Sequence, residues 1–397
     1  MECETETAVM ERTTHRCGGM DWESARQVAA AAAPVLPAVS VPLAVAAGCR
    51  LAEPLRALVA LPGVDVSAMD GYAVAGPRPW RVLGRVLAGG EPFAGALEPG
   101  EAVEIATGAP VPPGAHSVLP YESAHHGVTP GFVLGEVERG RHIRRRGEDV
   151  AENAVVLPAR TLLTPVVLGF AAGLGHDTLR VHPCPRVDIL VTGDEVLTTG
   201  LPGPGRVRDA IGPWLPGLIT WAGGETRSPV RLPDGAAPLH AALADESAGD
   251  ILVVCGASSK GPADHLHEVL TDMGAEILVD GVSVRPGHPQ LLARLRSGRL
   301  LVGLPGNPFA ALSAALTLLA PALSSSCAPG PLATLATQVK PHPTSTRLLP
   351  VHLTGTTAHP VGHDRPGSLW GAALADALAV IPPAWSGGPV EILELPR

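Results

Sequence analysis

Lysine is almost missing from this sequence, since only Lys260 and Lys340 occur and arginine supplies nearly all of the positive charge. The six cysteines are scattered and form no CxxC pair, so the sequence supports neither a zinc knuckle nor a disulfide framework. A net charge of −9 does not suggest a basic face of the kind that follows the phosphates of nucleic acid. We therefore expect no nucleic-acid partner and a reducing compartment, the cytoplasm.

Signals for export and for a membrane span are also missing. Residues 1–20 are acidic and polar rather than a signal peptide, and we expect them to form a disordered tail. The segment 29–49 is nearly all apolar, but Pro34, Pro37 and Pro42 interrupt it and disfavour a continuous helix. We therefore expect no contact with a membrane.

Three familiar catalytic or binding motifs are absent as well. No GxSxG nucleophile elbow, no GxGxxG dinucleotide loop and no GxxxxGK[ST] phosphate loop occurs. What is present is a chain of 397 residues, 46% hydrophobic and 17% charged, which indicates a globular protein of two or three domains. Its 46 glycines and 42 prolines lie between apolar runs and predict many turns and short strands.

The N-terminal half predicts a mixture of helices and β-rich segments. Asp21 or Ser24 can cap a helix that runs through Ala33 and stops at Pro34, and a second helix is expected over residues 43–56. From residue 80 to about 157, short β-rich runs alternate with turns, which predicts a compact β domain. Residues 163–174 read as helix again.

From residue 186 the pattern changes to strand, polar loop and helix, repeated to about residue 325. This alternation predicts a doubly wound, largely parallel α/β sheet, and residues 335–397 read as a small β domain. Three polar loops follow strands, so they should gather at one sheet edge: TGDE (192–195), GASSKG (256–261) and GLPGNP (303–308).

The chemistry of these loops fits a bound cation and a bound anion, but ordinary structure explains them too. Adjacent acids such as Asp194 and Glu195 suit Mg²⁺, although Asp and Thr are also common helix caps. Backbone amides of a loop such as 256–261, with Lys260 beside them, attract an anion, although a plain βα loop looks the same. Asp209 and Asp264 open helices and on their own read as caps.

Together and in order, these segments resemble the molybdopterin molybdenumtransferases, the family that includes the E domain of gephyrin. The resemblance covers roughly residues 21–397, and it rests on these segments: SAMDGYAV (67–74), GGEPF (89–93), GEAVEIATGAPVPPGAHSVLPYE (100–122), IRRRGEDV (143–150), PRVDILVTGDEV (185–196), GASSKGPADH (256–265), RPGHP (285–289) and GLPGNP (303–308).

The resemblance implies a multidomain fold and a reaction. The fold would combine a parallel molybdopterin-binding α/β domain with an inserted β domain and a C-terminal β domain. Members are homodimers that use molybdate, adenylylated molybdopterin and Mg²⁺, release AMP and leave molybdenum on the dithiolene sulfurs. The domains would be a tail over 1–20, a helical linking domain over 21–56 and 143–184, the inserted β domain over 57–142, the α/β domain over 185–326 and the C-terminal β domain over 327–397.

The resemblance also implies roles for individual residues. The expected catalytic residues are Asp70, Thr107, Asp149 and Glu195. The expected metal ligands are Asp194, Glu195 and Asp264. The expected substrate-binding residues are Asp209, Ser259, Lys260, Gly261, Asp264, Pro286, His288 and Pro289, the last three of them at the molybdate.

Five positions depart from the family pattern. Alanine, isoleucine and three histidines replace the usual residues, at Ala257, Ile211, His116, His267 and His288. An isoleucine offers a ligand no hydrogen bond, and a histidine is only partly charged near neutral pH. Two alternatives therefore stay open: a pterin-binding or regulatory paralogue with weak turnover, and an enzyme for another oxyanion such as tungstate.

The retained acidic residues lead to the first prediction. Asp70→Asn is nearly isosteric, so we expect it to abolish or strongly reduce the release of AMP from adenylylated molybdopterin while the protein still folds. The assay is AMP release by the purified variant, with circular dichroism as the control for folding. Turnover at the wild-type level would make Asp70 a structural residue.

Overall fold

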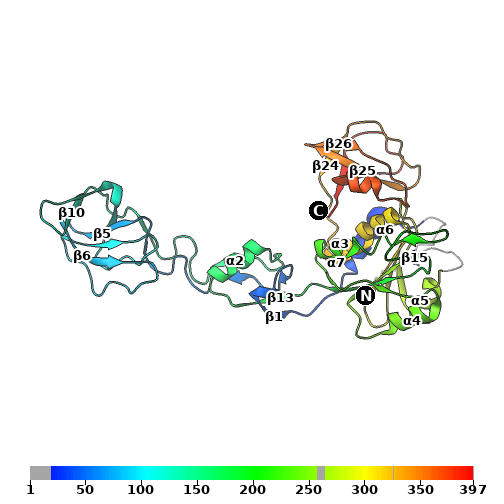
Figure 1. Cartoon of the computed structure of the whole chain (residues 1–397), viewed down its shortest axis with the longest axis horizontal. Helices are drawn as coiled ribbons and strands as arrows, with labels where there is room; N and C mark the ends of the chain where they lie inside the picture. Colours follow the sequence, from blue (N-terminus) through cyan, green and yellow to red (C-terminus); the bar gives the residue numbers. More distant parts are fainter. Residues whose placement is uncertain (1–18, 257–263, 325, 397) are drawn as a thin grey trace, which may run out of the picture. The chain divides into compact units, whose positions relative to one another are not determined.

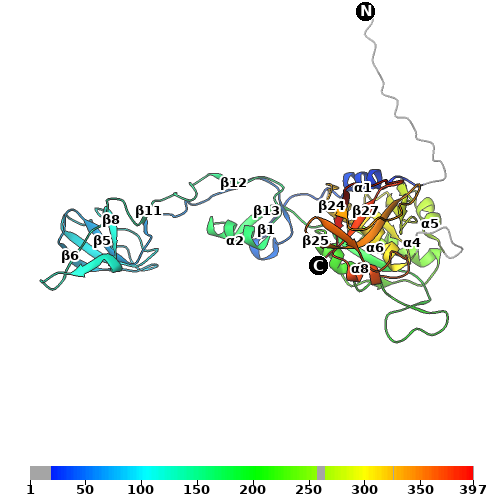
Figure 2. The same ribbon diagram turned by 90° about the horizontal axis from the view of Figure 1, so that it is seen from above.

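The computed structural model describes residues 19–256, 264–324 and 326–396. The chain divides into two compact units, drawn in Figure 1 and, turned by 90°, in Figure 2. The larger unit combines the described part of residues 1–36 with residues 184–397, and the smaller unit is residues 37–183. Each unit is described by itself.

A mostly parallel sheet forms the centre of the larger unit. Strands β14, β17, β18, β19 and β23 run parallel, and β22 and β20 add an antiparallel edge. The strands are β14 (Arg186–Val191), β17 (Glu225–Thr226), β18 (Val230–Arg231), β19 (Ile251–Cys255), β20 (Glu276–Asp280), β22 (Leu291–Arg294) and β23 (Leu300–Leu304). The predicted doubly wound sheet is therefore confirmed.

Helices cover both faces of this sheet because its strands are apolar on both sides. Ile189, Val253 and Val302 pack into the core beneath α1, α3 and α6, whereas Leu252 and Leu301 pack on the opposite face beneath α4 and α5. The helical segments are α1 (Trp22–Ala31), α3 (Leu215–Trp221), α4 (Ala236–Ala244), α5 (Leu266–Asp272), α6 (Pro308–Ala314), the π-helical η3 (Ala315–Leu319) and α7 (Ala320–Ser324).

Helix α1 begins as the sequence predicts, with the Asp21 carboxylate accepting from the Ser24 N–H at 2.9 Å. The helix packs against η3 and α7, and the buried Trp22 Nε1 donates to Thr317 Oγ1 at 3.1 Å. The sequence groups this helix with residues 37–56, but these contacts place it in the larger unit. The boundaries of the predicted linking domain stay a prediction.

A second sheet closes the C-terminal part of the larger unit, and Figure 2 labels its strands β24, β25 and β27. Its order is β21-β25-β26-β24-β28-β27, with β25 also pairing with β27. The elements are β21 (Val284–Arg285), β24 (Leu332–Leu335), β25 (Thr346–Thr354), β26 (Thr357–Pro360), α8 (Trp370–Leu374), β27 (Ala377–Ile381) and β28 (Val390–Glu394). Because β21 contains Arg285, the first residue of the RPGHP loop, its pairing with Thr346 and Arg347 brings that loop to this sheet.

The smaller unit contains the predicted β domain, a sheet of order β8-β5-β7-β6-β10-β9. Its strands are β5 (Gly71–Ala75), β6 (Trp80–Val86), β7 (Glu101–Ile105), β8 (Ser117–Pro120), β9 (Ala124–His126) and β10 (Phe132–Gly135), and η2 (Tyr121–Ser123) follows β8. Separate apolar cores lie on its two faces, one around Val103 and the other around Leu119.

The rest of the smaller unit is built from short strands and one helix. A three-stranded sheet joins β1 (Val39–Pro42), β13 (Thr178–His182) and β2 (Arg50–Leu51). Helix α2 (Pro165–Gly173) begins after Thr164 and confirms the helix predicted over residues 163–174. Strand pairs join β11 (Ile143–Arg144) to β4 (Val66–Ser67) and β12 (Val155–Leu157) to β3 (Leu55–Arg56).

In the larger unit β15 (Val196–Leu197) pairs with β16 (Val207–Arg208).

The predicted helix over residues 43–56 is wrong. The chain forms only the 3₁₀ turn η1 (Leu43–Val45) there, followed by strands β2 and β3. Gly48 has φ of 81°, which ends the helical turn, and the pairing of β2 with β13 determines the conformation of the residues that follow.

Among the described residues, no helix has the length and apolar character needed to cross a membrane.

The contact between α1 and the sheet-covering helices predicts a stability effect. Thr317→Val keeps the shape of the side chain but leaves the buried Trp22 N–H without its acceptor, which costs about 1–3 kcal/mol. We expect a lower melting temperature and a lower urea midpoint than for Thr317→Ser, which keeps the hydroxyl. Equal loss in the two variants would contradict a role for this hydrogen bond.

Candidate functional site

The carboxyl ends of β14, β19 and β23 bring the predicted loops together. The Thr192 N–H and hydroxyl both lie 3.0 Å from the Cys255 carbonyl oxygen, so the first two strands are tied at this edge. Gly256 has φ of 98°, and a Cβ there would lie 3.0 Å from Thr192 Oγ1. A Cβ on Gly306 would lie 3.6 Å from the Gly256 Cα. Among the described residues, the TGDE loop, Gly256 and the GLPGNP loop therefore meet at one edge, and the rest of the GASSKG loop lies outside the described residues.

An aspartate that the sequence does not mark holds the TGDE loop. The Asp234 carboxylate accepts from the Gly193 N–H at 2.8 Å and from the Asp194 N–H at 3.0 Å. Arg231 donates to the Gly193 carbonyl at 2.7 Å, and Arg206 donates to the Asp194 carbonyl. These contacts engage only the backbone of the loop, and Asp194 and Glu195 are exposed.

Asp209 closes the next turn beside this loop. Its Oδ1 accepts from the N–H groups of Ile211 and Gly212 at 2.9 and 2.8 Å, which closes an Asx turn. The expected helix cap is wrong, because α3 begins later, at Leu215, with Trp214 as its N-cap residue. Burial, followed by the nearby Asp209 charge, raises the pKa of the Cys255 thiol. The assignment of Asp209 to substrate binding stays a prediction.

Part of the predicted site falls outside the described residues. Ser259, Lys260 and Gly261, together with Ala257, belong to the segment 257–263. Asp264 follows it, half-buried, and accepts from the Leu266 N–H at 3.1 Å. Within the ranges that the structure describes, no three His, Cys, Asp or Glu side chains are grouped to hold a metal ion. The ligand set Asp194, Glu195 and Asp264 stays a prediction.

A cleft of about 750 Å³ collects the RPGHP loop and residues of the C-terminal sheet. Its lining includes the predicted molybdate residues, Pro286, His288 and Pro289. It also contains four charged or titratable residues that the sequence does not mark as site residues: Lys340, His342, Arg347 and Asp364. The signal that could have found one of them is the scarcity of lysine, because Lys340 is one of only two in the chain.

Most of the charge in this cleft is positive. Arg347 Nε is paired with Asp364 at 2.5 Å, whereas Arg285 and Lys340 form no ion pair among the described residues. His288 Nδ1 lies 2.7 Å from the Val282 carbonyl and must donate to it, so Nε2 is the ring nitrogen left for a ligand. Only a protonated ring can donate from Nε2, and a lysine at this position would not have that limitation.

The smaller unit holds the other predicted catalytic residues. Asp70 Oδ1 accepts from the Thr107 N–H at 2.7 Å and from the Thr107 hydroxyl at 3.1 Å, so the structure brings these two together. Asp149 forms an ion pair with Arg144 in the exposed IRRRGED loop. The Arg146 N–H and the Arg145 guanidinium hold the pKa of Asp65 below its usual range, which fixes that loop next to residues 63–67.

Three departures from the family pattern have structural partners. His116 lies within hydrogen-bond distance of the Gly76 carbonyl and the Ser117 hydroxyl, and His267 Nε2 lies 3.0 Å from Asp280. Ile211 is 6% exposed and packs into the core of the larger unit. These side chains are occupied within the fold, whereas His288 lines the cleft.

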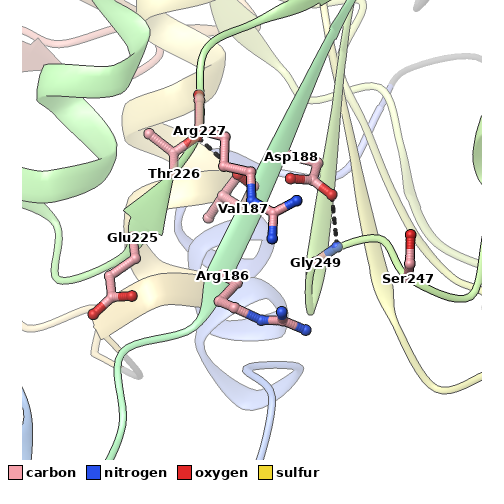
Figure 3. A pocket seen from close by; sticks show the side chains of 8 residues that line it. All are labelled: Arg186, Val187, Asp188, Glu225, Thr226, Arg227, Ser247 and Gly249. Atoms are coloured by element: carbon pink, nitrogen blue, oxygen red, sulfur yellow. Dashed lines mark hydrogen bonds between the residues drawn. The ribbon is translucent and has the colours of Figure 1, made fainter.

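A smaller notch of about 210 Å³ lies at the amino ends of the parallel strands, opposite the loops described above (Figure 3). Arg186 and Arg227 extend beside it. The Asp188 carboxylate accepts from the Gly249 N–H at 2.7 Å, and the Thr226 hydroxyl donates to the Val187 carbonyl at 2.7 Å. The notch contains none of the predicted site residues, and two of its polar groups serve the fold.

Family models match nearly the whole described chain. The MoeA N-terminal region (domain I and II) matches residues 20–175, a probable molybdopterin binding domain matches residues 188–325, and the MoeA C-terminal region (domain IV) matches residues 333–393.

Named relatives and a solved structure agree with these models. Molybdopterin molybdenumtransferase 2 of Mycobacterium tuberculosis is 35% identical over 69% of this chain and 71% of its own length. The molybdopterin molybdenumtransferase of Synechococcus elongatus is 34% identical over 71% and 74%. The crystal structure of a molybdopterin biosynthesis MoeA protein from Pyrococcus horikoshii superposes with a TM-score of 0.75, at 26% identity over 94% of this chain and 98% of that chain.

The geometry of the TGDE loop leads to a prediction that needs no activity assay. Asp234→Ala removes both acceptors, so we expect the Gly193 and Asp194 amides to exchange with solvent at least about tenfold faster, as the loss of hydrogen bonds to a charged group implies. Hydrogen-exchange mass spectrometry of the peptide over 192–197 measures this.

The matched control is Asp245→Ala, which removes a carboxylate that accepts from the Ser247 N–H at 2.9 Å in another loop of the same unit. It should leave exchange at residues 192–197 unchanged. Unchanged exchange in Asp234→Ala would show that the loop does not depend on Asp234.

Proposed function

The chain belongs to the molybdopterin molybdenumtransferase family, and on that premise we propose how this transferase of molybdenum cofactor biosynthesis works. It takes molybdenum from molybdate, inserts it into adenylylated molybdopterin and releases AMP in a Mg²⁺-dependent step. The observation that carries the proposal is the positively charged cleft around Lys340, in a chain whose net charge is −9. Both substrates are anions, and an acidic protein needs a local cationic site to bind them.

The cleft suits a small tetrahedral oxyanion such as molybdate. Arg285 and Lys340 supply charge that no described carboxylate neutralises, and Arg347 is held in place by Asp364. His288 adds a donor when its ring is protonated. Backbone turns at Pro286 and Pro289 fix the loop, so the anion meets groups that are already positioned.

Asp194 and Glu195 fit the expected magnesium site. They are adjacent, exposed and not engaged by hydrogen bonds from other described side chains, while Asp234 fixes the backbone that carries them. Mg²⁺ typically takes one or two carboxylates and completes its shell with water and substrate phosphates. When bound, the ion would neutralise phosphate charge and polarise a phosphoryl oxygen.

Asp70 is the base that the geometry favours in the smaller unit. Thr107 engages its Oδ1 twice, which orients the carboxylate and leaves Oδ2 as the oxygen able to accept a proton. We assign to it the proton of the water that attacks the phosphoanhydride, with AMP as the leaving group. Asp149, paired with Arg144, would contribute charge to the same step. In a homodimer these residues would face the α/β domain of a second copy.

A reconstituted reaction tests the proposal. Purified protein with adenylylated molybdopterin, Mg²⁺ and molybdate should yield both AMP and molybdenum-loaded molybdopterin, and omission of Mg²⁺ should stop both. Tight pterin binding without AMP release would instead identify a binding or regulatory paralogue. Replacing molybdate with tungstate in the same assay decides between the oxyanions, because the charge of the cleft alone does not distinguish them.

The cleft generates its own prediction. Lys340→Gln removes one uncompensated positive charge, so we expect molybdate to bind about tenfold more weakly, in line with a charged hydrogen bond of roughly 1.5 kcal/mol. Isothermal titration of the full-length variant with molybdate measures the change.

Arg227→Gln is the control, since Arg227 lies in the notch at the other sheet edge and should not alter molybdate binding. If Lys340→Gln binds molybdate as tightly as the wild type does, the oxyanion site lies elsewhere.

A further inference from the structure

The chain has only two tyrosines, and both lie next to Asp70. Tyr72 follows Asp70 by two residues in β5. Tyr121 lies opposite Asp70, because β5 and β8 pair with Gly71 facing Pro120 and the Tyr121 N–H donates to the Asp70 carbonyl at 3.3 Å. An aromatic ring therefore stands beside the proposed base, at the end of the same two strands.

Two contacts fix the position of the Tyr121 side chain, and an ion pair fixes its partner Glu104. Its hydroxyl donates to Glu104 Oε1 at 2.6 Å, and Glu104 Oε2 is paired with Arg85 Nε at 2.7 Å. The Tyr72 ring meets it edge to face, with ring centroids 5.4 Å apart. Burial, followed by the hydrogen bond to Glu104, raises the pKa of Tyr121 to about 12, so its hydroxyl keeps its proton and remains a donor.

Packing alone does not account for this ring. Tyr72 is 9% exposed and belongs to the core, whereas Tyr121 is 43% exposed. An exposed tyrosine normally moves among rotamers, but this one has already lost that freedom through its contacts. A ligand that stacks on a fixed ring pays little further entropy, and preorganised aromatic surface of this kind is characteristic of binding sites.

The anchor of the ring and the anchor of the base share one strand. Glu104, which holds Tyr121, lies in β7, and Thr107, which holds Asp70, follows three residues later. Strand β7 pairs directly with β5 along Gly71–Ala75. The residues that anchor the ring and the carboxylate therefore belong to one strand and the turn that follows it, in the same sheet.

We propose that Tyr121 is a substrate-binding residue whose ring stacks on a planar nitrogen heterocycle of the substrate while Asp70 acts at the neighbouring phosphate. Glu104 and Arg85 are positioning residues for that ring. The inference rests on the proposed function, because that substrate carries two such heterocycles, an adenine and a pterin. Stacking recognises the flat π face that both share.

Kinetics of AMP release test the stacking role. Tyr121→Ala should raise the KM for adenylylated molybdopterin about tenfold, a loss typical of one stacked base, while kcat changes little. Tyr121→Phe and Tyr121→Trp, which keep an aromatic ring, should stay much closer to the wild type. Tyr121→Leu keeps bulk without a π face and should behave like alanine. If leucine restores the KM, the residue only fills space and the proposal is overturned.

Equilibrium binding separates the two heterocycles and does not need turnover. Isothermal titration compares wild type and Tyr121→Leu with AMP, with ribose 5-phosphate and with neopterin phosphate. Weaker binding of AMP alone assigns the ring to adenine, and weaker binding of the pterin alone assigns it to the pterin. Equal binding of both probes by the two proteins overturns the proposal, whatever the activity of the wild type.

The control is Trp221→Ala, since Trp221 is 44% exposed, almost the same as Tyr121, and lies at the end of α3 in the other unit. It should leave KM and both titrations unchanged. Melting curves of every variant show that the proteins are folded. A wild type without turnover but with ring-dependent binding would reject the proposed function and retain this inference.

Discussion

The close approach of three strand ends is the constraint on which the larger unit depends. Thr192 can donate twice to the Cys255 carbonyl because β14 and β19 end at the same level. The residue after Cys255 is Gly256, where a positive φ and the close approach of Thr192 require glycine. Gly306 brings the third loop to the same place. Larger side chains at Gly256 and Gly306 would separate the loops. The positions of the acidic residues on these loops therefore depend on the backbone geometry.

Acidic and basic side chains of the larger unit are gathered in two different places. The exposed carboxylates of Asp194 and Glu195 lie on a loop whose backbone is fixed by Asp234 and two arginines. Arg285 and Lys340, which form no ion pair among the described residues, line the cleft beside the RPGHP loop. Strand β21 makes this possible, since its pairing with β25 brings residues 285–289 and 340–347 together across more than fifty residues of sequence. The smaller unit adds an oriented carboxylate and, beside it, a fixed tyrosine.

The departures from the family pattern divide into two kinds once their contacts are known. In this chain Ile211 packs in the core, and His116 and His267 form hydrogen bonds within the fold. None of these contacts involves a ligand. His288 is different because it lines the cleft with one ring nitrogen already committed to the Val282 carbonyl. Among the described departures, His288 is therefore the one whose side chain lines a cleft.

The sequence by itself determined the doubly wound sheet, the β domain and the gathering of the loops, because apolar runs of strand length followed by glycine-rich loops leave few other arrangements. It also ordered the motifs that identify the family. The helix predicted from the sequence over residues 43–56 is wrong, because Gly48 and the pairing with β13 outweigh helix propensity. The sequence also did not identify Asp234, Lys340 or Tyr121. Asp234 contacts a loop 40 residues away, Lys340 lines a cleft together with the RPGHP loop, and Tyr121 is held by Glu104 of another strand. Only the tertiary structure decides such contacts, because hydrogen bonds and charges act over a few ångströms of space, whatever the separation in sequence.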